Sequence, residues 1–315
     1  MNFNILVQFL TGKFNGSDEL QCFWMAFQGS MSTRNGPNHD RKMNWFNAFC
    51  VSVVSGYGGA LLAPLWMGRP SSILSNDLAL ASCIIAFVLI NYLPFDIGYK
   101  LGNTLPVTLV TCMFAQLFRT MGVVKFVAIA FEAFKATPSA YYPTPIFGPI
   151  VFATLLGNMG SFLLKGFNGH LEKGMPWPFQ NGLFCATLYH FFVNDQKGFI
   201  GNAMRDAVHS VPAIQMGLDD STFALVFVSA FMQITGMLQI PQFLGPSFSP
   251  ATSLIRLVRS VPSLSTTTKE VVKHEQEAFL NDKNNGQTNG AVTDYTKKKR
   301  SKQTKSKKKV TGKEL

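Results

Sequence analysis

A stretch of twenty residues without formal charge, 47–66, constrains this chain more than any other part of it. It reads Asn-Ala-Phe-Cys-Val-Ser-Val-Val-Ser-Gly-Tyr-Gly-Gly-Ala-Leu-Leu-Ala-Pro-Leu-Trp. At a rise of about 1.5 Å per residue, a helix of this length crosses a hydrocarbon core of about 30 Å. Gly56, Gly58 and Gly59 lie in its middle, and in lipid a glycine allows a second backbone to come close. The stretch therefore predicts a membrane-spanning helix that packs against another segment.

A similar stretch occurs about a hundred residues further along the chain. Residues 56–62 (Gly-Tyr-Gly-Gly-Ala-Leu-Leu) are similar to residues 157–164 (Gly-Asn-Met-Gly-Ser-Phe-Leu-Leu). Each copy is followed, after a polar loop, by an apolar segment that ends in an acid, Asp96 or Asp195. From the second glycine of the pair to that acid the distance is 37 residues in the first copy and 35 in the second. Two units of three spans each would lie inverted in the membrane, because three is odd. The alternative is that small residues of membrane helices recur here by chance.

The composition favours a polytopic membrane protein. Only 14% of the residues are charged, against about 25% in soluble domains, and 29 are phenylalanine. The net charge of +11 comes mostly from lysine and arginine clusters at 297–302 and 305–309. Beside a membrane core, such a basic segment indicates a cytosolic tail and not a nucleic-acid-binding region.

Apolar runs and turn residues divide the chain into seven predicted spans and a tail. The spans cover about 8–31, 45–66, 77–94, 105–124, 145–165, 179–194 and 222–243. Residues 1–255 form the predicted channel domain, and 256–315 form a tail that should be disordered. Glutamines and a glycine interrupt the first span, so we expect it to face protein or water. The predicted fold class is an all-α polytopic membrane protein with two inverted three-helix repeats and a seventh helix.

No catalytic constellation is visible, so we expect no enzymatic activity. The five histidines and five cysteines are scattered, without spacings typical of a metal site or a disulfide framework. Arg119 stands out, because a charge at membrane depth costs about 2.5–3.5 kcal/mol on insertion scales. It either faces a water-filled path, an anion or a partner, or it snorkels to the interface. Lys125 reads as interfacial, and Asp96 either borders water or pairs with a basic side chain.

Three motifs of the first half resemble the trimeric intracellular cation channels of the endoplasmic and sarcoplasmic reticulum. They are Gly-Arg-Pro at 68–70, Pro-Phe-Asp-x-x-Tyr-Lys at 94–100 and Leu-Pro-Val at 105–107. The resemblance covers about residues 1–255. It implies seven helices in two inverted repeats plus one, a lumenal N-terminus, a cytosolic basic tail, and a pore through each protomer of a homotrimer.

This chain keeps only part of the functional motif of that family. The family motif resembles Lys-Glu-Val-x-Arg, whose basic residues line the pore and hold a phosphoinositide head group. This chain has Ala115-Gln116-Leu117-Phe118-Arg119, which keeps only the arginine and resembles a divergent member such as those of nematodes and other invertebrates. Residues expected along the ion path are Arg119, Gln116, Gly56, Gly58, Gly59, Gly157, Gly160 and Asp96. Residues expected at a lipid head group are Arg119 and Lys125.

The resemblance implies a potassium channel of the reticulum membrane that supplies counter-ions during calcium release. Potassium is the expected permeant ion, and phosphatidylinositol bisphosphate the expected bound lipid. Membrane lipids are the expected partners besides the other protomers, and no nucleic acid is expected. A small-metabolite carrier built on the same repeat is the alternative, and a membrane scaffold acting through the basic tail is a third possibility.

Overall fold

The computed structural model of the chain describes residues 3–71, 73–136, 141–156, 159–160, 175–211, 217–240 and 249–250. Every regular element within these ranges is helical, as the predicted all-α class requires. The chain divides into two units, Met1–Thr252 and Ser253–Leu315. The predicted tail, 256–315, lies outside the described residues, so the fold concerns the first unit.

Three helices of the described part are long and apolar enough to cross a membrane. They are α3 (Trp45–Trp66), α6 (Leu105–Phe134) and α12 (Asp220–Gln239). A fourth span is possible if α4 (Asp77–Asn91) and the segment Pro94–Gly102, bent by 92° from it, form one crossing. That segment contains η1 (Pro94–Asp96) and α5 (Ile97–Gly102). By length and composition, the described residues thus show three or four apolar spans.

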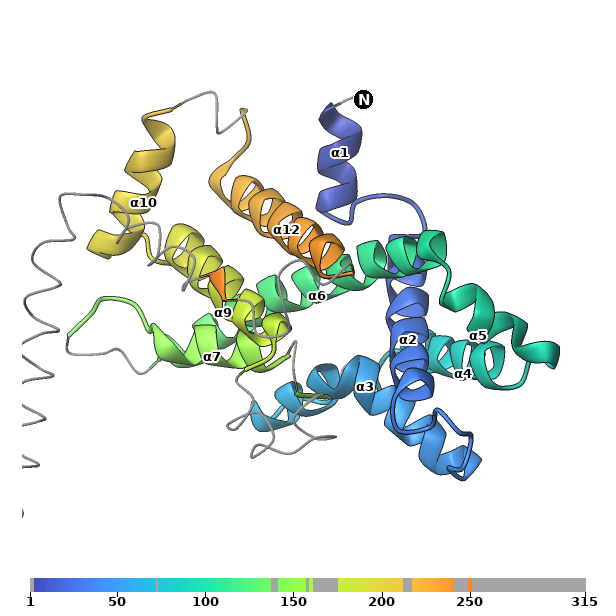
Figure 1. Cartoon of the computed structure of the whole chain (residues 1–315). Coiled ribbons are helices and arrows are strands. Elements are labelled where there is room, and N and C mark those ends of the chain that lie inside the picture. Colours follow the sequence, from blue (N-terminus) through green and yellow to red (C-terminus); the bar gives the residue numbers. More distant parts are fainter. Residues whose placement is uncertain are drawn as a thin grey trace, which may run out of the picture. The chain divides into compact units, whose positions relative to one another are not determined.

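The segment predicted as a first span, 8–31, is two helices, α1 (Phe3–Leu10) and α2 (Ser17–Asn35). Gly12 (φ 67°) and Gly16 (φ 74°) adopt the left-handed conformation between them, which ends one helix and precedes the next. Helix α2 packs against α3, α4 and α6 in the middle of the bundle (Figure 1). Protein therefore surrounds the polar side chains that interrupt its hydropathy.

Other helices extend or shorten the predicted spans. Helix α6 continues ten residues beyond the predicted end at 124, because Val123, Phe126, Val127 and Ala130 form one buried stripe at helical spacing. The remaining described helices are α7 (Phe147–Leu156), α9 (Trp177–Tyr189) with its π-helical end η2 (His190–Asn194), and α10 (Phe199–His209).

The bundle contains two apolar cores. One joins residues of α2, α3 and α4, including Cys22, Tyr57 and Cys83, and the other joins α6, α7, α9 and α12. Helix α6 belongs to both, since Ala115 lies in the first core and Val127 in the second. Apart from Ala63 of α3, the buried residues of the second core begin at Val123, so α3 and α6 both connect the two cores.

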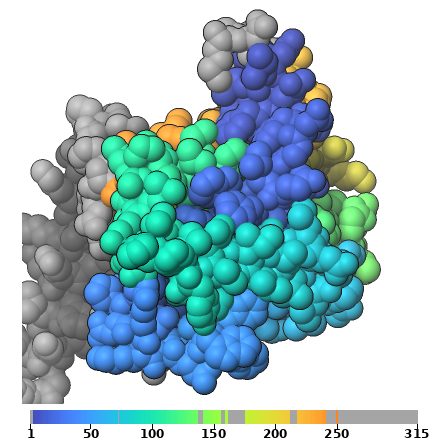
Figure 2. Space-filling model, turned by 90° about the vertical axis from the view of Figure 1, so that its right-hand side faces the viewer, coloured from blue at the N-terminus to red at the C-terminus, as the bar shows by residue number. Residues whose placement is uncertain are grey.

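Helices α4 and α5 form much of the face in Figure 2, together with α2 and α3. The two helices carry large apolar side chains that remain exposed in the single chain: Leu80, Ile84, Ile85, Val88, Ile97 and Leu101. Exposed apolar groups of this size indicate a surface for lipid or for another protein chain.

A sharp bend separates α4 from α5. Phe95 (φ 58°) and Asp96 (φ 59°) both adopt the left-handed conformation, which costs a residue with a side chain about 1–2 kcal/mol. The Asp96 carboxylate forms an ion pair with Arg41, from the loop after α2. Close by, the Tyr99 hydroxyl donates to Asn35 Oδ1 at 2.7 Å. These contacts tie the bend to the C-terminal end of α2.

A buried carboxylate at the end of η2 also joins segments that are distant in sequence. Asp195 is fully buried and accepts hydrogen bonds from the Tyr142 hydroxyl (2.6 Å), the Thr144 hydroxyl (2.7 Å) and the Gly201 N–H (3.0 Å). Burial alone would raise the pKa of Asp195, but these hydrogen bonds to the ionised form outweigh it and hold the pKa below its usual value. Asp195 therefore joins the segment before α7 to the start of α10.

Replacing Asp195 by asparagine should lower the free energy of unfolding by about 1–3 kcal/mol, because the amide NH2 would face a hydroxyl or N–H donor. The contribution of the native carboxylate is complete above its unfolded pKa of about 3.9 and is lost as the pH falls through the lower folded value. Thermal unfolding of the detergent-purified protein between neutral pH and pH 3 measures both effects.

Asp206→Asn is the matched control, since Asp206 is exposed on α10. It should leave the unfolding temperature unchanged at every pH. Equal effects of the two substitutions would contradict the role given to Asp195.

Candidate functional site

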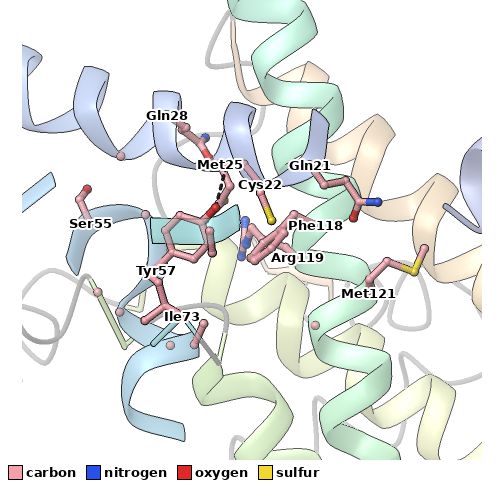
Figure 3. Close-up of a pocket in the computed structure, with 18 of the residues that line it drawn as sticks. Gln21, Cys22, Met25, Gln28, Ser55, Tyr57, Ile73, Phe118, Arg119 and Met121 are labelled. Atoms are coloured by element: carbon pink, nitrogen blue, oxygen red, sulfur yellow. Dashed lines mark hydrogen bonds between the residues drawn. The ribbon is translucent and has the colours of Figure 1, made fainter. Parts of the chain in front are cut away.

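A cavity of about 610 Å³ lies between α2, α3 and α6. Figure 3 shows side chains from these helices pointing into it. Helix α2 contributes a stripe at helical spacing: Asp18, Gln21, Cys22, Met25, Gln28, Gly29 and Ser32. Ser32 lies fourteen positions after Asp18, so the cavity follows α2 for about 21 Å at a rise of about 1.5 Å per residue. The cavity is therefore elongated along the bundle, with a polar wall on one side.

Glycines make up the wall on α3. Gly56, Gly58 and Gly59 border the cavity, and so does Gly160. A Cβ atom on Gly58 would collide with the backbone of Gly160, so the two chain segments touch at their main chains. Gly56 faces α2, where a Cβ would lie 3.0 Å from the Met25 carbonyl oxygen. Both glycines thus face protein.

The other expected glycine, Gly157, lies outside the described residues. Of the two glycines in the second glycine-rich segment, only Gly160 lies among the described residues. Even so, Gly160 shows that the two glycine-rich segments meet at the cavity.

Arg119 reaches the cavity from α6 and is only 9% exposed. Its Nη1 donates to Gln116 Oε1 at 3.2 Å, and its Nη2 donates to the Pro178 carbonyl oxygen at 3.2 Å. The guanidinium carbon also lies 5.9 Å from the centre of the Trp177 ring. These contacts hold the side chain between α6 and the start of α9.

The charge of Arg119 is incompletely compensated. Its Nε has no hydrogen-bond partner among the described residues, and no carboxylate in that part of the chain lies within ion-pair distance. Lys125, six residues further along α6, is exposed and borders the same cavity. A buried guanidinium without a counter-charge is costly, so this wall is suited to an anionic group.

Two of the expected residues do not line the cavity. Gln116 is buried against α12, where its side chain contacts the position of Gly236, and it acts on the cavity only through Arg119. Asp96 lies at the bend after α4 and is paired with Arg41. Neither is among the residues that border this space in the described chain.

Sequence reasoning missed the contribution of α2 and of Tyr57. The Tyr57 ring borders the cavity, and its buried hydroxyl donates to the Cys22 carbonyl oxygen at 2.6 Å, which fixes α3 against α2. A signal was present for α2, since Asp18, Gln21, Gln28 and Ser32 share one helical face. Their polarity predicts that the first span faces protein or water, but it does not identify this face as the wall of a cavity.

The arrangement is suited to holding and passing small polar species. The cavity combines hydroxyl and amide side chains, close-packed glycine backbones and two basic groups with one acid. In the described part of the chain, no three histidine, cysteine or acidic side chains are grouped so that they could hold a metal ion.

The chain is similar to known channel proteins in sequence and in structure. Residues 35–166 match the sequence profile of the TRIC channel family. A structure of a trimeric intracellular cation channel from C. elegans without Ca²⁺ has a TM-score of 0.53 at 15% identity, and the match covers 76% of this chain and 98% of that one. This likeness shows the fold. No curated protein matches the chain in sequence.

Two further structures match with lower TM-scores. A TRIC counter-ion channel described in calcium release has a TM-score of 0.49 at 17% identity, over 74% of this chain and 98% of that one. The C. elegans channel with bound Ca²⁺ has a TM-score of 0.43 at 14% identity, over 71% and 89%. The profile match includes Gly56, Gly58, Gly160 and Arg119, whereas the polar stripe of α2 precedes it.

Proposed function

The chain belongs to the TRIC channel family, and we propose that it conducts potassium ions through the cavity between α2, α3 and α6. The observation that carries the proposal is the cavity itself: it is elongated along the bundle, lies within a single chain and is bordered by polar side chains and glycine backbones as well as by apolar side chains such as Met25 and Phe118. A polar path of this kind is costly in a membrane bundle unless it holds water or ions. An intracellular membrane is the family's location, and we propose the endoplasmic or sarcoplasmic reticulum, with a counter-ion role during calcium release.

We propose seven spans, with two inverted three-helix units and α12 as the added helix. In that arrangement the loop after α2 and the bend after α4 lie on the cytosolic side, and the segments before α7 and after η2 lie on the lumenal side. The ion pair Arg41–Asp96 and the hydrogen bond Tyr142–Asp195 each join segments that this topology assigns to the same side. The contact of Gly58 with Gly160 supports units that meet face to face.

Arg119 and Lys125 are proposed to hold an acidic lipid head group, with phosphatidylinositol bisphosphate as the candidate. A fixed positive charge repels cations, by about 4 kcal/mol at 4 Å for an effective dielectric constant of 20. An anion at the unpartnered Nε of Arg119 would reduce this repulsion and complete the guanidinium's hydrogen bonds. The lipid thus has a physical reason to be present in a cation path.

A homotrimer is proposed from the same comparison, because the similar C. elegans channel is trimeric. The exposed apolar side chains of α4 and α5 provide a surface for such contacts. Chemical cross-linking in detergent measures the assembly, and a ladder that stops at dimer would contradict it.

Recording from the purified full-length protein in a planar bilayer tests the function. Across a KCl gradient we expect single-channel steps that reverse near the potassium equilibrium potential. Replacing potassium by a bulky organic cation should abolish them. Absence of potassium current would overturn the proposal, and saturable solute uptake without current steps would favour a carrier.

A further inference from the structure

More basic than acidic side chains border the cavity, and this excess of positive charge disfavours the entry of cations. Its bordering residues include two basic side chains, Arg119 and Lys125, and one acidic side chain, Asp18. We infer that the Asp18 carboxylate draws cations into the cavity and sets its preference for cations over anions. This inference rests on the proposed function, since it concerns the selectivity of the same cavity.

The position of Asp18 suits an entrance. It lies in the first turn of α2, at one end of the polar stripe that follows the cavity to Ser32. Its side chain is exposed, so ions in water can reach it. A carboxylate at the end of an elongated cavity acts on every ion that enters there.

No partner within the described chain neutralises the charge of the Asp18 carboxylate. Its side chain forms no ion pair or hydrogen bond within the described chain. Two other acids discussed above are engaged elsewhere: Asp96 pairs with Arg41, and Asp195 binds Tyr142 and Thr144. The field of Asp18 is therefore not cancelled by a partner at the same site.

A purely structural explanation exists for an acid at this position, because carboxylates in the first turn stabilise a helix by about 0.3–1 kcal/mol. Glu19, the next residue, lies in the same first turn and is also exposed, but it does not border the cavity. Substitutions at the two residues therefore distinguish an effect on helix stability, which both share, from an effect on ions in the cavity, which only Asp18 should have.

Recordings of Asp18→Asn and Glu19→Gln in planar bilayers test the inference. For Asp18→Asn we expect at least an about twofold loss of potassium conductance at about 0.01 M KCl, and a reversal potential shifted toward that of chloride. At about 1 M KCl the loss of conductance should nearly disappear, because the Debye length falls from about 30 Å to about 3 Å. Glu19→Gln should resemble the wild type at both concentrations.

Each outcome decides between the proposals. If the wild type conducts potassium and both variants behave alike, the inference about Asp18 is wrong while the channel function stands. If the wild type passes no potassium current, the proposed function itself fails. Thermal unfolding of both variants should show equal small changes, and a collapse of Asp18→Asn alone would assign this residue to folding instead. Asp18→Glu, which keeps the charge, should restore conductance and selectivity.

Discussion

Replacing Gly58 by alanine should destabilise the protein by about 1–3 kcal/mol, the usual cost of forcing a methyl group into a filled space. The new Cβ would fall on the Gly160 backbone, and a main chain held within a helix bundle cannot move aside as a side-chain end can. At about 2–4 °C per kcal/mol, the midpoint of thermal unfolding should fall by several degrees. We also expect loss of conduction, because the two glycine segments border the cavity.

Gly56→Ala is the matched control, two residues away on the same helix. Its Cβ would lie 3.0 Å from the Met25 carbonyl oxygen, whereas that of Gly58→Ala would lie 2.4 Å from the Gly160 Cα atom, so the main-chain shift needed and the loss of stability should both be smaller. Alanine also gains about 1 kcal/mol of helix propensity over glycine, which offsets part of that cost. Equal unfolding temperatures for Gly58→Ala and the wild type would show that α3 and the Gly160 segment do not touch.

Replacing Arg119 by alanine should reduce binding of acidic lipid by about 10- to 100-fold, since a hydrogen bond to a charged group contributes about 1.5–3 kcal/mol. The charges that remain at the cavity, Asp18 and Lys125, then balance. Conductance in bilayers without phosphoinositide should therefore rise relative to the wild type. Flotation with vesicles containing phosphatidylinositol bisphosphate and planar-bilayer recording measure the two effects.

Arg119→Lys separates charge from geometry. Lysine keeps the positive charge, but it cannot reach both the Gln116 oxygen and the Pro178 carbonyl with a planar fork. We expect it to retain part of the lipid affinity. If neither lipid content nor conductance changes in Arg119→Ala, the arginine has no part in the site.

The glycine-rich helix is the part of this fold that sequence predicted best. The apolar run at 47–66 is α3, Trp45–Trp66, because length and hydropathy alone determine a lipid-spanning helix. Helix α2 could not be identified in the same way. Polar side chains interrupt it, because it packs against other helices and not against lipid. The sequence of one segment does not show which helices will surround it.

The candidate site was predictable only in part, for a similar reason. Arg119 was recognisable because a charge within an apolar run is expensive wherever the helix packs. Gln116 lies three residues from it and shares its motif, yet its side chain packs against Gly236 of α12. Which side of α6 faces the cavity depends on contacts more than a hundred residues away in sequence, such as the hydrogen bond from Gln233 to the Met113 carbonyl oxygen.

Helix α6 contributes Ala115 to one apolar core and Val127 to the other, and Arg119 lies between these two positions. Helix α3 also has residues in both cores, Tyr57 in the first and Ala63 in the second, so these two helices hold the halves of the bundle together. Of the two hydrogen bonds of Arg119, the one to Gln116 lies within α6, and only the one to the Pro178 carbonyl oxygen joins α6 to the start of α9. Arg119 lies where the two cores meet, so a change in the position of α9 relative to α6 would also change the hydrogen bonding of a buried charge.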